Sequence, residues 1–222
     1  MSGEAAWAVF DLDGTLIESE QIWRDVRHEF VIANGGRWPA STEAAMIGMR
    51  TVEWAEYIHD QLGVALAPAT IAKRILQGVV ERLQDPPLLP GADAALERLG
   101  NAFRLGLASS ASLPVVQTVL AKTGWNKYFA VVVSADEVPR GKPAPDVYLR
   151  TLALLDADPS RTAAVEDSAN GIRSAHAARL AVVAIPNHAF PPDEEALELA
   201  SRVLPNLDAL DVAVIREVLA AP

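Results

Sequence analysis

The stretch Phe10-Asp11-Leu12-Asp13-Gly14-Thr15-Leu16 begins with the last residue of the short apolar run 7–10. That run has the composition of a buried strand. In an extended segment, side chains two positions apart point the same way, so Asp11 and Asp13 can face one site. Gly14 allows the backbone to turn away close to them. Two adjacent carboxylates repel each other unless a cation lies between them, and oxygen ligands of this kind suit Mg²⁺. Taken alone, the two acids could equally cap a following helix.

Outward from this stretch, short apolar runs alternate with longer segments of helical spacing. The strand candidates are 103–108, 129–133, 162–165 and 180–185, and the helix candidates are 92–99, 113–123, 145–155 and 170–178. Strands that alternate with helices favour a parallel sheet covered on both faces. We therefore expect an α/β core of the Rossmann-like, three-layer type.

The segment 17–89 breaks this alternation. It offers no convincing strand, and 20–33, 52–62 and 68–83 have the spacing of amphipathic helices. The proline-rich run 85–91 ends the last of them and resembles a linker. The sequence thus predicts a catalytic core of residues 1–16 and 90–222, with a helical cap domain of residues 17–89 inserted after the first strand.

Composition narrows the classes of function. The chain has 222 residues, no cysteine and a net charge of −10. Without cysteine there is no disulfide, thiolate nucleophile or cysteine-bound zinc. The negative charge disfavours nucleic acid and anionic membranes as partners. No signal peptide or membrane span is apparent, so we expect a cytoplasmic protein that is a monomer or a weak homodimer.

Polar residues also follow three later strand candidates. Ser109-Ser110 ends the second strand, Gly141-Lys142-Pro143-Ala144-Pro145-Asp146 forms a loop, and Glu166-Asp167-Ser168 ends the fourth strand. In open parallel sheets, ligands bind at the carboxyl ends of the strands. Each motif has a structural alternative, because serine and aspartate often cap helices and most lysines are solvated.

Together the four motifs resemble those of the haloacid dehalogenase superfamily of phosphohydrolases. The matching pieces are DLDGT at 11–15, LASS at 107–110, GKPAPD at 141–146 and EDS at 166–168. The place of the insert resembles the subfamily with a small α-helical cap, which includes phosphoglycolate phosphatase and β-phosphoglucomutase. The resemblance covers nearly the whole chain and says little about the substrate.

The resemblance implies a role for each matching residue. Asp11 would attack phosphorus and also bind Mg²⁺, and Asp13 would act as general acid and base while its carbonyl contributes to the metal site. Ser109 would bind a phosphoryl oxygen, with Ser110 beside it, and Lys142 would neutralise Asp11 and the phosphate. The remaining metal ligands would be Asp167 directly and Glu166 directly or through water.

The physical chemistry of phosphoryl transfer agrees with these roles. The reaction needs in-line positioning and charge stabilisation, and a carboxylate nucleophile divides hydrolysis into two easier steps. We therefore expect a Mg²⁺-dependent phosphatase for a small phosphorylated metabolite, working through an aspartyl phosphate. Arg50 lies where related caps reach the substrate, and its guanidinium could hold a phosphate or carboxylate. A solvated arginine at a helix end is an equal alternative.

Other reactions remain open to different degrees. As the resemblance aligns the two, β-phosphoglucomutase carries a histidine in the first cap helix, where this sequence has Trp23, and this difference favours hydrolysis over a sugar-phosphate mutase. A dehalogenase would lack Asp13, and a phosphonate-cleaving enzyme would need a cap lysine earlier than Lys73. A non-catalytic phospho-ligand-binding module is a remote alternative, because every catalytic position is intact. The four histidines have no metal-ligand spacing.

Overall fold

The computed structural model describes residues 6–46, 49–188 and 190–221, and its core is one parallel sheet. The strand order is β3-β2-β1-β4-β5-β6, which places β1 at the centre. The strands are β1 (Trp7–Phe10), β2 (Arg104–Ser109), β3 (Phe129–Ser134), β4 (Thr162–Glu166), β5 (Ala181–Ala184) and β6 (Arg202–Val203). The five strands predicted from the sequence are present within one or two residues at each end; β6 was not predicted.

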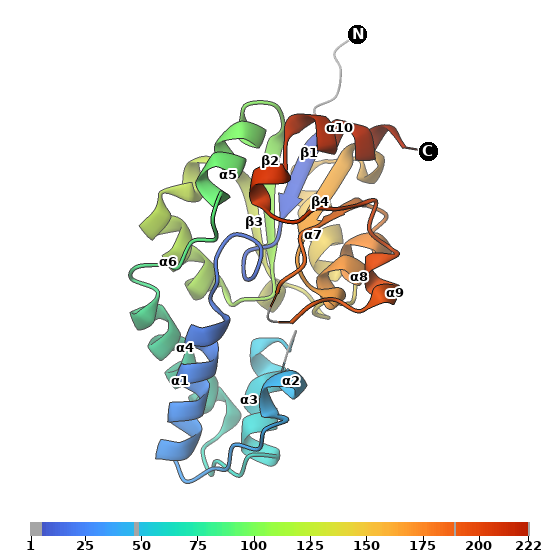
Figure 1. Cartoon of the computed structure of the whole chain (residues 1–222). Coiled ribbons are helices and arrows are strands. Elements are labelled where there is room, and N and C mark those ends of the chain that lie inside the picture. Colours follow the sequence, from blue (N-terminus) through green and yellow to red (C-terminus); the bar gives the residue numbers. More distant parts are fainter. Residues whose placement is uncertain (1–5, 47–48, 189, 222) are drawn as a thin grey trace.

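Helices cover both faces of the sheet, as Figure 1 shows. They are α5 (Ala92–Gly100), α6 (Leu113–Thr123), α7 (Asp146–Leu155), α8 (Ala169–Ala177), α9 (Glu194–Leu197) and α10 (Val212–Ala220). Successive side chains of β1 point to opposite faces of the sheet. Ala8 and Phe10 pack in the hydrophobic cluster on one face, and Trp7 and Val9 pack in the cluster on the other. The predicted three-layer α/β architecture is therefore confirmed.

In the described part of the inserted segment, residues 17–46 and 49–89, four helices lie together beside the core (Figure 1). They are α1 (Glu20–Ala33), α2 (Thr42–Met46), α3 (Thr51–Asp60) and α4 (Pro68–Arg82). Three follow the predicted segments, whereas the short α2 was missed because five residues carry too little periodicity. The helices α1 and α3 both pack against α4, and α4 also contacts α6 of the core.

Two stretches of chain connect this insert to the core, and they run side by side. Glu18 N donates to Pro87 O over 2.8 Å, and Leu89 N donates to Leu16 O over 2.9 Å. The division between core and cap at 17–89 stays a prediction, but this paired crossing lies at its proposed ends. Among the described residues, no helix is both long enough and apolar enough to cross a lipid bilayer.

Candidate active site

The acids of the first and fourth motifs meet at the carboxyl ends of neighbouring strands. Parallel pairing of β1 with β4 places Phe10 opposite Val165, and Asp11 N donates to Val165 O over 3.0 Å. Asp11 and the pair Glu166-Asp167 therefore leave the sheet at the same level. One carboxylate oxygen from each of these three buried acids lies within 4.8 Å of the others.

Lys142 lies at the centre of the acids. Its Nζ donates to Asp11 Oδ1 and to Glu166 Oε1, both over 2.6 Å, and to Ala108 O over 3.0 Å. Burial alone would lower the pKa of Lys142, but the charges of Asp11 and Glu166 outweigh burial and raise that pKa above its usual value. The lysine is therefore a permanent cation at this site.

Tyr148 completes the support of Glu166, and the sequence analysis did not find it. Its hydroxyl donates to Glu166 Oε1 over 2.6 Å, and its ring lies 5.2 Å from Lys142 Nζ. The second oxygen, Glu166 Oε2, accepts from the backbone N–H of Asp167 over 3.3 Å. Both oxygens of Glu166 thus have protein partners, which orients it toward holding Lys142.

Asp13 is held by hydroxyl groups from two different segments. Ser19 Oγ donates to Asp13 Oδ1, and Ser109 Oγ donates to Asp13 Oδ2 over 3.5 Å. Burial raises the pKa of Asp13 above its usual value, and hydrogen bonds from Ser19, Trp23 and Ser109 partly offset the rise. Ser19 was not predicted, because a serine before a helix is an ordinary capping residue.

The acids have the properties of a cation site. Burial, together with the neighbouring Glu166 and Asp13, raises the pKa of Asp11 to about 7 despite Lys142, and burial with Asp11 and Glu166 raises that of Asp167 well above its usual value. The positive charge of Lys142 therefore does not fully compensate the negative charges of Asp11 and Asp167. The donors are all oxygen atoms, which fits Mg²⁺.

Gly14 allows this close approach of β1 to the acids of β4. Its φ is +83°, a left-handed conformation that costs glycine little. A Cβ atom at this position would lie 2.1 Å from Asp167 Oδ2, so only glycine leaves space for that carboxylate. Thr15 Oγ1 donates to Asp167 Oδ1 over 3.3 Å and orients it further.

The three serines of the predicted motifs differ in their surroundings and hydrogen bonds. Ser109 is buried, and its Oγ accepts from Ala111 N over 3.0 Å, while Ser110 lines the cavity described below. Ser168 Oγ accepts from Gly171 N over 3.1 Å and so caps α8, the structural alternative considered for it.

Arg50 lies away from the acids. Its Nη1 donates to Val138 O over 3.2 Å and to Pro139 O over 2.8 Å, and its Nε pairs with Glu53 Oε1 over 3.0 Å. Arg50 is not among the residues that line the cavity. Its guanidinium joins the cap to the core instead of pointing to the acids, so the predicted contact with a substrate has no counterpart among its present contacts.

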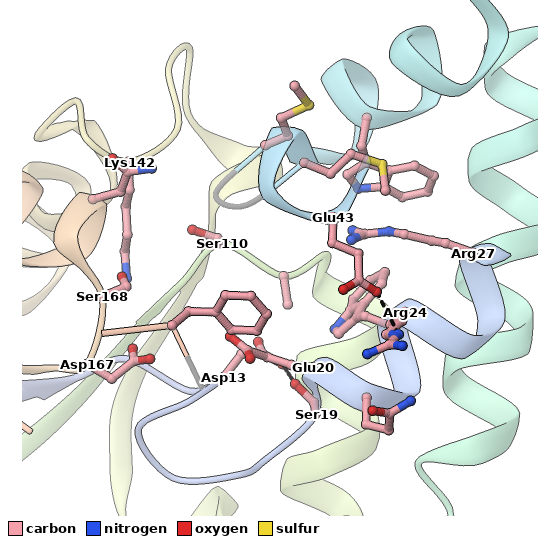
Figure 2. Close-up of a pocket in the computed structure, with 18 of the residues that line it drawn as sticks. Asp13, Ser19, Glu20, Arg24, Arg27, Glu43, Ser110, Lys142, Asp167 and Ser168 are labelled. Carbon is pink, nitrogen blue, oxygen red and sulfur yellow. Dashed lines mark hydrogen bonds and ion pairs between the residues drawn. The ribbon is translucent and has the colours of Figure 1, made fainter. Parts of the chain in front are cut away.

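A cavity of about 470 Å³ separates the acids from the cap (Figure 2). Asp11, Asp13, Lys142 and Asp167 lie on its core side. The cap contributes both aromatic and charged side chains: Glu20, Trp23, Arg24, Arg27, Trp38, Glu43, Met46, Met49 and Trp54. This volume lies within the range of about 300–1,000 Å³ that is usual for small-molecule sites.

Comparison with known proteins agrees with this geometry. The family model of haloacid dehalogenase-like hydrolases matches residues 6–179, a range that contains strands β1 to β4, the inserted helices and all four motifs. The chain belongs to the haloacid dehalogenase-like hydrolases. The superfamily predicted from the four motifs is therefore confirmed.

Individual relatives of this hydrolase include phosphatases. It is 34% identical to protein CbbY of Rhodobacter capsulatus, over 94% of this chain and 96% of CbbY. It is 30% identical to hexitol phosphatase B of Escherichia coli, over 81% of this chain and 82% of that enzyme. A solved structure of CbbY from Rhodobacter sphaeroides is similar over 95% of this chain and 99% of that chain, with a TM-score of 0.84 and 28% identity. The hydrolase is accordingly a phosphatase.

Proposed function

We propose that this phosphatase hydrolyses a small phosphorylated metabolite with several hydroxyl groups, through a phosphoryl group carried by Asp11. The contact between Lys142 Nζ and Asp11 Oδ1 supports this most directly. It engages one oxygen of the carboxylate, while the other accepts no hydrogen bond from the residues that the structure describes. The relatives support the substrate class: one is a hexitol phosphatase, and the CbbY structure is a complex with xylulose-1,5-bisphosphate.

In the first step, the free oxygen of Asp11 attacks phosphorus as the bond to the leaving oxygen breaks. Asp13 gives its proton to that oxygen, so the alcohol departs neutral. In the second step, Asp13 takes a proton from water, which attacks phosphorus, releases phosphate and restores Asp11. The raised pKa of Asp13 favours a proton on it near neutral pH.

Lys142 and a metal ion would stabilise the negative charge of the phosphoryl group. Asp11 and Asp167 would hold Mg²⁺, with the Asp13 carbonyl as a further ligand, while Glu166 keeps Lys142 in place or contributes through water. When bound, Mg²⁺ supplies positive charge to the phosphoryl oxygens. Lys142 removes the repulsion between the Asp11 carboxylate and the incoming phosphate.

Hydrolysis, and not transfer to a sugar, fits the first cap helix. Trp23 lies in the cavity, and an indole cannot accept a proton from a sugar hydroxyl. We expect inorganic phosphate as the product from sugar phosphates such as β-glucose 1-phosphate. A cytoplasmic location and a monomeric or weakly dimeric state stay predictions from the sequence.

The test compares Asp11→Asn with the wild-type enzyme, using release of phosphate from an aryl phosphate. The variant should fold and lose at least about a thousandfold in kcat, because the nucleophile is gone. Asp85→Asn, at an exposed aspartate between cap and core, is the matched control and should keep full activity. Excess EDTA should abolish wild-type turnover and Mg²⁺ should restore it. Normal turnover by Asp11→Asn would refute the proposal.

A further inference from the structure

An arginine on the cap side of the cavity forms no ion pair with the residues that the structure describes. Arg27 of α1 lines the cavity, and its Nε is enclosed without a hydrogen-bond partner. Within the described part of the chain, no side chain or carbonyl forms a hydrogen bond or an ion pair with Arg27. Its neighbour Arg24 differs, because Arg24 Nε pairs with Glu43 Oε1 over 2.8 Å.

Two indole rings hold the Arg27 guanidinium. Its central carbon lies 4.7 Å from the ring centroid of Trp23 and 5.1 Å from that of Trp54. The two indoles meet edge to face, with centroids 6.3 Å apart. A guanidinium that lies over aromatic rings can still donate its N–H groups to an oxyanion. Figure 2 shows this group directed into the pocket.

Keeping this charge inside the cap is unfavourable for the free protein. Burial lowers the pKa of Arg27 to about 10, although the charges of Asp13 and Glu43 partly offset burial. Arg27 is therefore still a cation at neutral pH. The Arg27 side chain is half-buried, and enclosing a charge is unfavourable unless the charge is paired. A ligand that brings a negative charge would supply the missing partner.

Glu20 adds an acceptor between Arg27 and the acids. Its Oε2 is enclosed and accepts no hydrogen bond from the described residues. Glu20 lines the same cavity as Arg27 and Asp13, as Figure 2 shows. A hydroxyl group of a ligand could donate to this oxygen. The cavity thus offers a phosphoryl site, an acceptor for hydroxyl groups and an unpaired cation.

We propose that Arg27 binds a second anionic group of the substrate, a phosphate or a carboxylate, at the end remote from the transferred phosphoryl group. This proposal rests on the proposed function, because it takes Asp11 as the place of reaction. The substrate is then a polyhydroxy chain with an anionic group at each end. Arg27 makes the enzyme prefer it to a compound with a neutral remote end.

The test uses three six-carbon substrates that differ at the remote end. Sorbitol 6-phosphate ends in a neutral hydroxyl, 6-phosphogluconate in a carboxylate, and sorbitol 1,6-bisphosphate in a phosphate. In the presence of Mg²⁺, the wild-type kcat/KM should be at least about tenfold higher for one of the two doubly anionic compounds than for sorbitol 6-phosphate. The compound with the larger ratio identifies the anion.

Arg27→Gln should reduce this ratio to about one. Arg74→Gln removes a charge from an exposed position of α4 and should leave the ratio unchanged. Should the glutamine variant fail to fold, Arg27→Lys serves in its place, and its ratio should fall at least about threefold because the planar fork is lost. A wild-type ratio near one, or a ratio retained without Arg27, would overturn the proposal. A failure of the proposed function would be recognised separately, because the Asp11→Asn variant would then still release phosphate.

Discussion

The hydroxyl of Tyr148 supports Lys142 indirectly, through Glu166. Tyr148→Phe removes one of the two hydrogen bonds to Glu166 Oε1 but keeps the ring beside Lys142. We expect the free energy of unfolding to fall by about 1.5–3 kcal/mol, the usual contribution of a hydrogen bond to a charged group. Denaturant unfolding measures this loss. Tyr128→Phe is the control, and an equal loss in both variants would contradict a specific role for Tyr148.

Glu20 should make stability depend on pH. Burial, followed by the charges of Glu18, Asp13 and Glu43, raises its pKa from 4.5 to about 7. Between those values the folded state holds a proton that the unfolded state has released, so stability from this group falls as pH rises. Without metal, Glu20→Gln should therefore gain stability over the wild type between pH 5 and pH 8.

The denaturation midpoints of the two proteins at pH 5 and pH 8 measure this effect. Glu56→Gln, at an exposed position of α3, should show the same pH dependence as the wild type. A constant difference between wild type and Glu20→Gln at both pH values would show that Glu20 does not titrate in this interval.

At the scale of elements, the turn after β1 depends on Gly14. Gly14→Ala and Gly124→Ala both place a side chain at positive φ, +83° and +72°, which costs about 1–2 kcal/mol. A Cβ at Gly124 meets nothing within 4 Å, whereas one at Gly14 meets the Asp167 carboxylate. Gly14→Ala should therefore lose additional stability, and its activity should require more Mg²⁺.

Thermal unfolding and titration of activity with Mg²⁺ compare the two glycine variants. Gly124→Ala should lose only the stability that a side chain at positive φ costs, and its activity should require the same Mg²⁺ concentration as that of the wild type. Equal behaviour of the two variants would mean that Asp167 can move aside without consequence.

For the whole molecule, Arg50 connects cap and core. Its bonds to the carbonyls of Val138 and Pro139 reach the loop that leads to Gly141, which packs against the Arg50 side chain. Arg50→Met should let the cap open, so the radius of gyration should increase and kcat/KM should fall roughly tenfold, because closure excludes water and completes the site. Solution X-ray scattering and steady-state kinetics measure the two effects.

Arg74→Met removes a charge from an exposed position of α4 and is the control for the effect of Arg50 on shape. If Arg50→Met loses activity while its radius of gyration stays at the wild-type value, Arg50 acts on the substrate, as the sequence predicted, and not on the arrangement of the domains.

The sequence by itself determined strands β1 to β5, most of the longer helices and the motifs whose polar residues meet at one edge of the sheet. Alternating strands and helices require a parallel sheet, and polar residues at the carboxyl ends of such strands must meet at one edge. For this reason Asp11, Lys142 and Asp167 could be identified from their motifs, and the structure brings them together. Short elements such as α2 and β6 were not predicted, because they contain too few residues for a periodic pattern of apolar positions.

Only the tertiary structure decided how side chains from distant segments meet. Tyr148 reaches Glu166, and Arg50 reaches carbonyls 88 and 89 positions away along the chain. Within the inserted helices, Arg24 of α1 likewise pairs with Glu43 of α2. Local sequence carries no signal for such contacts, because they depend on how the cap packs against the core and on which rotamers that packing leaves.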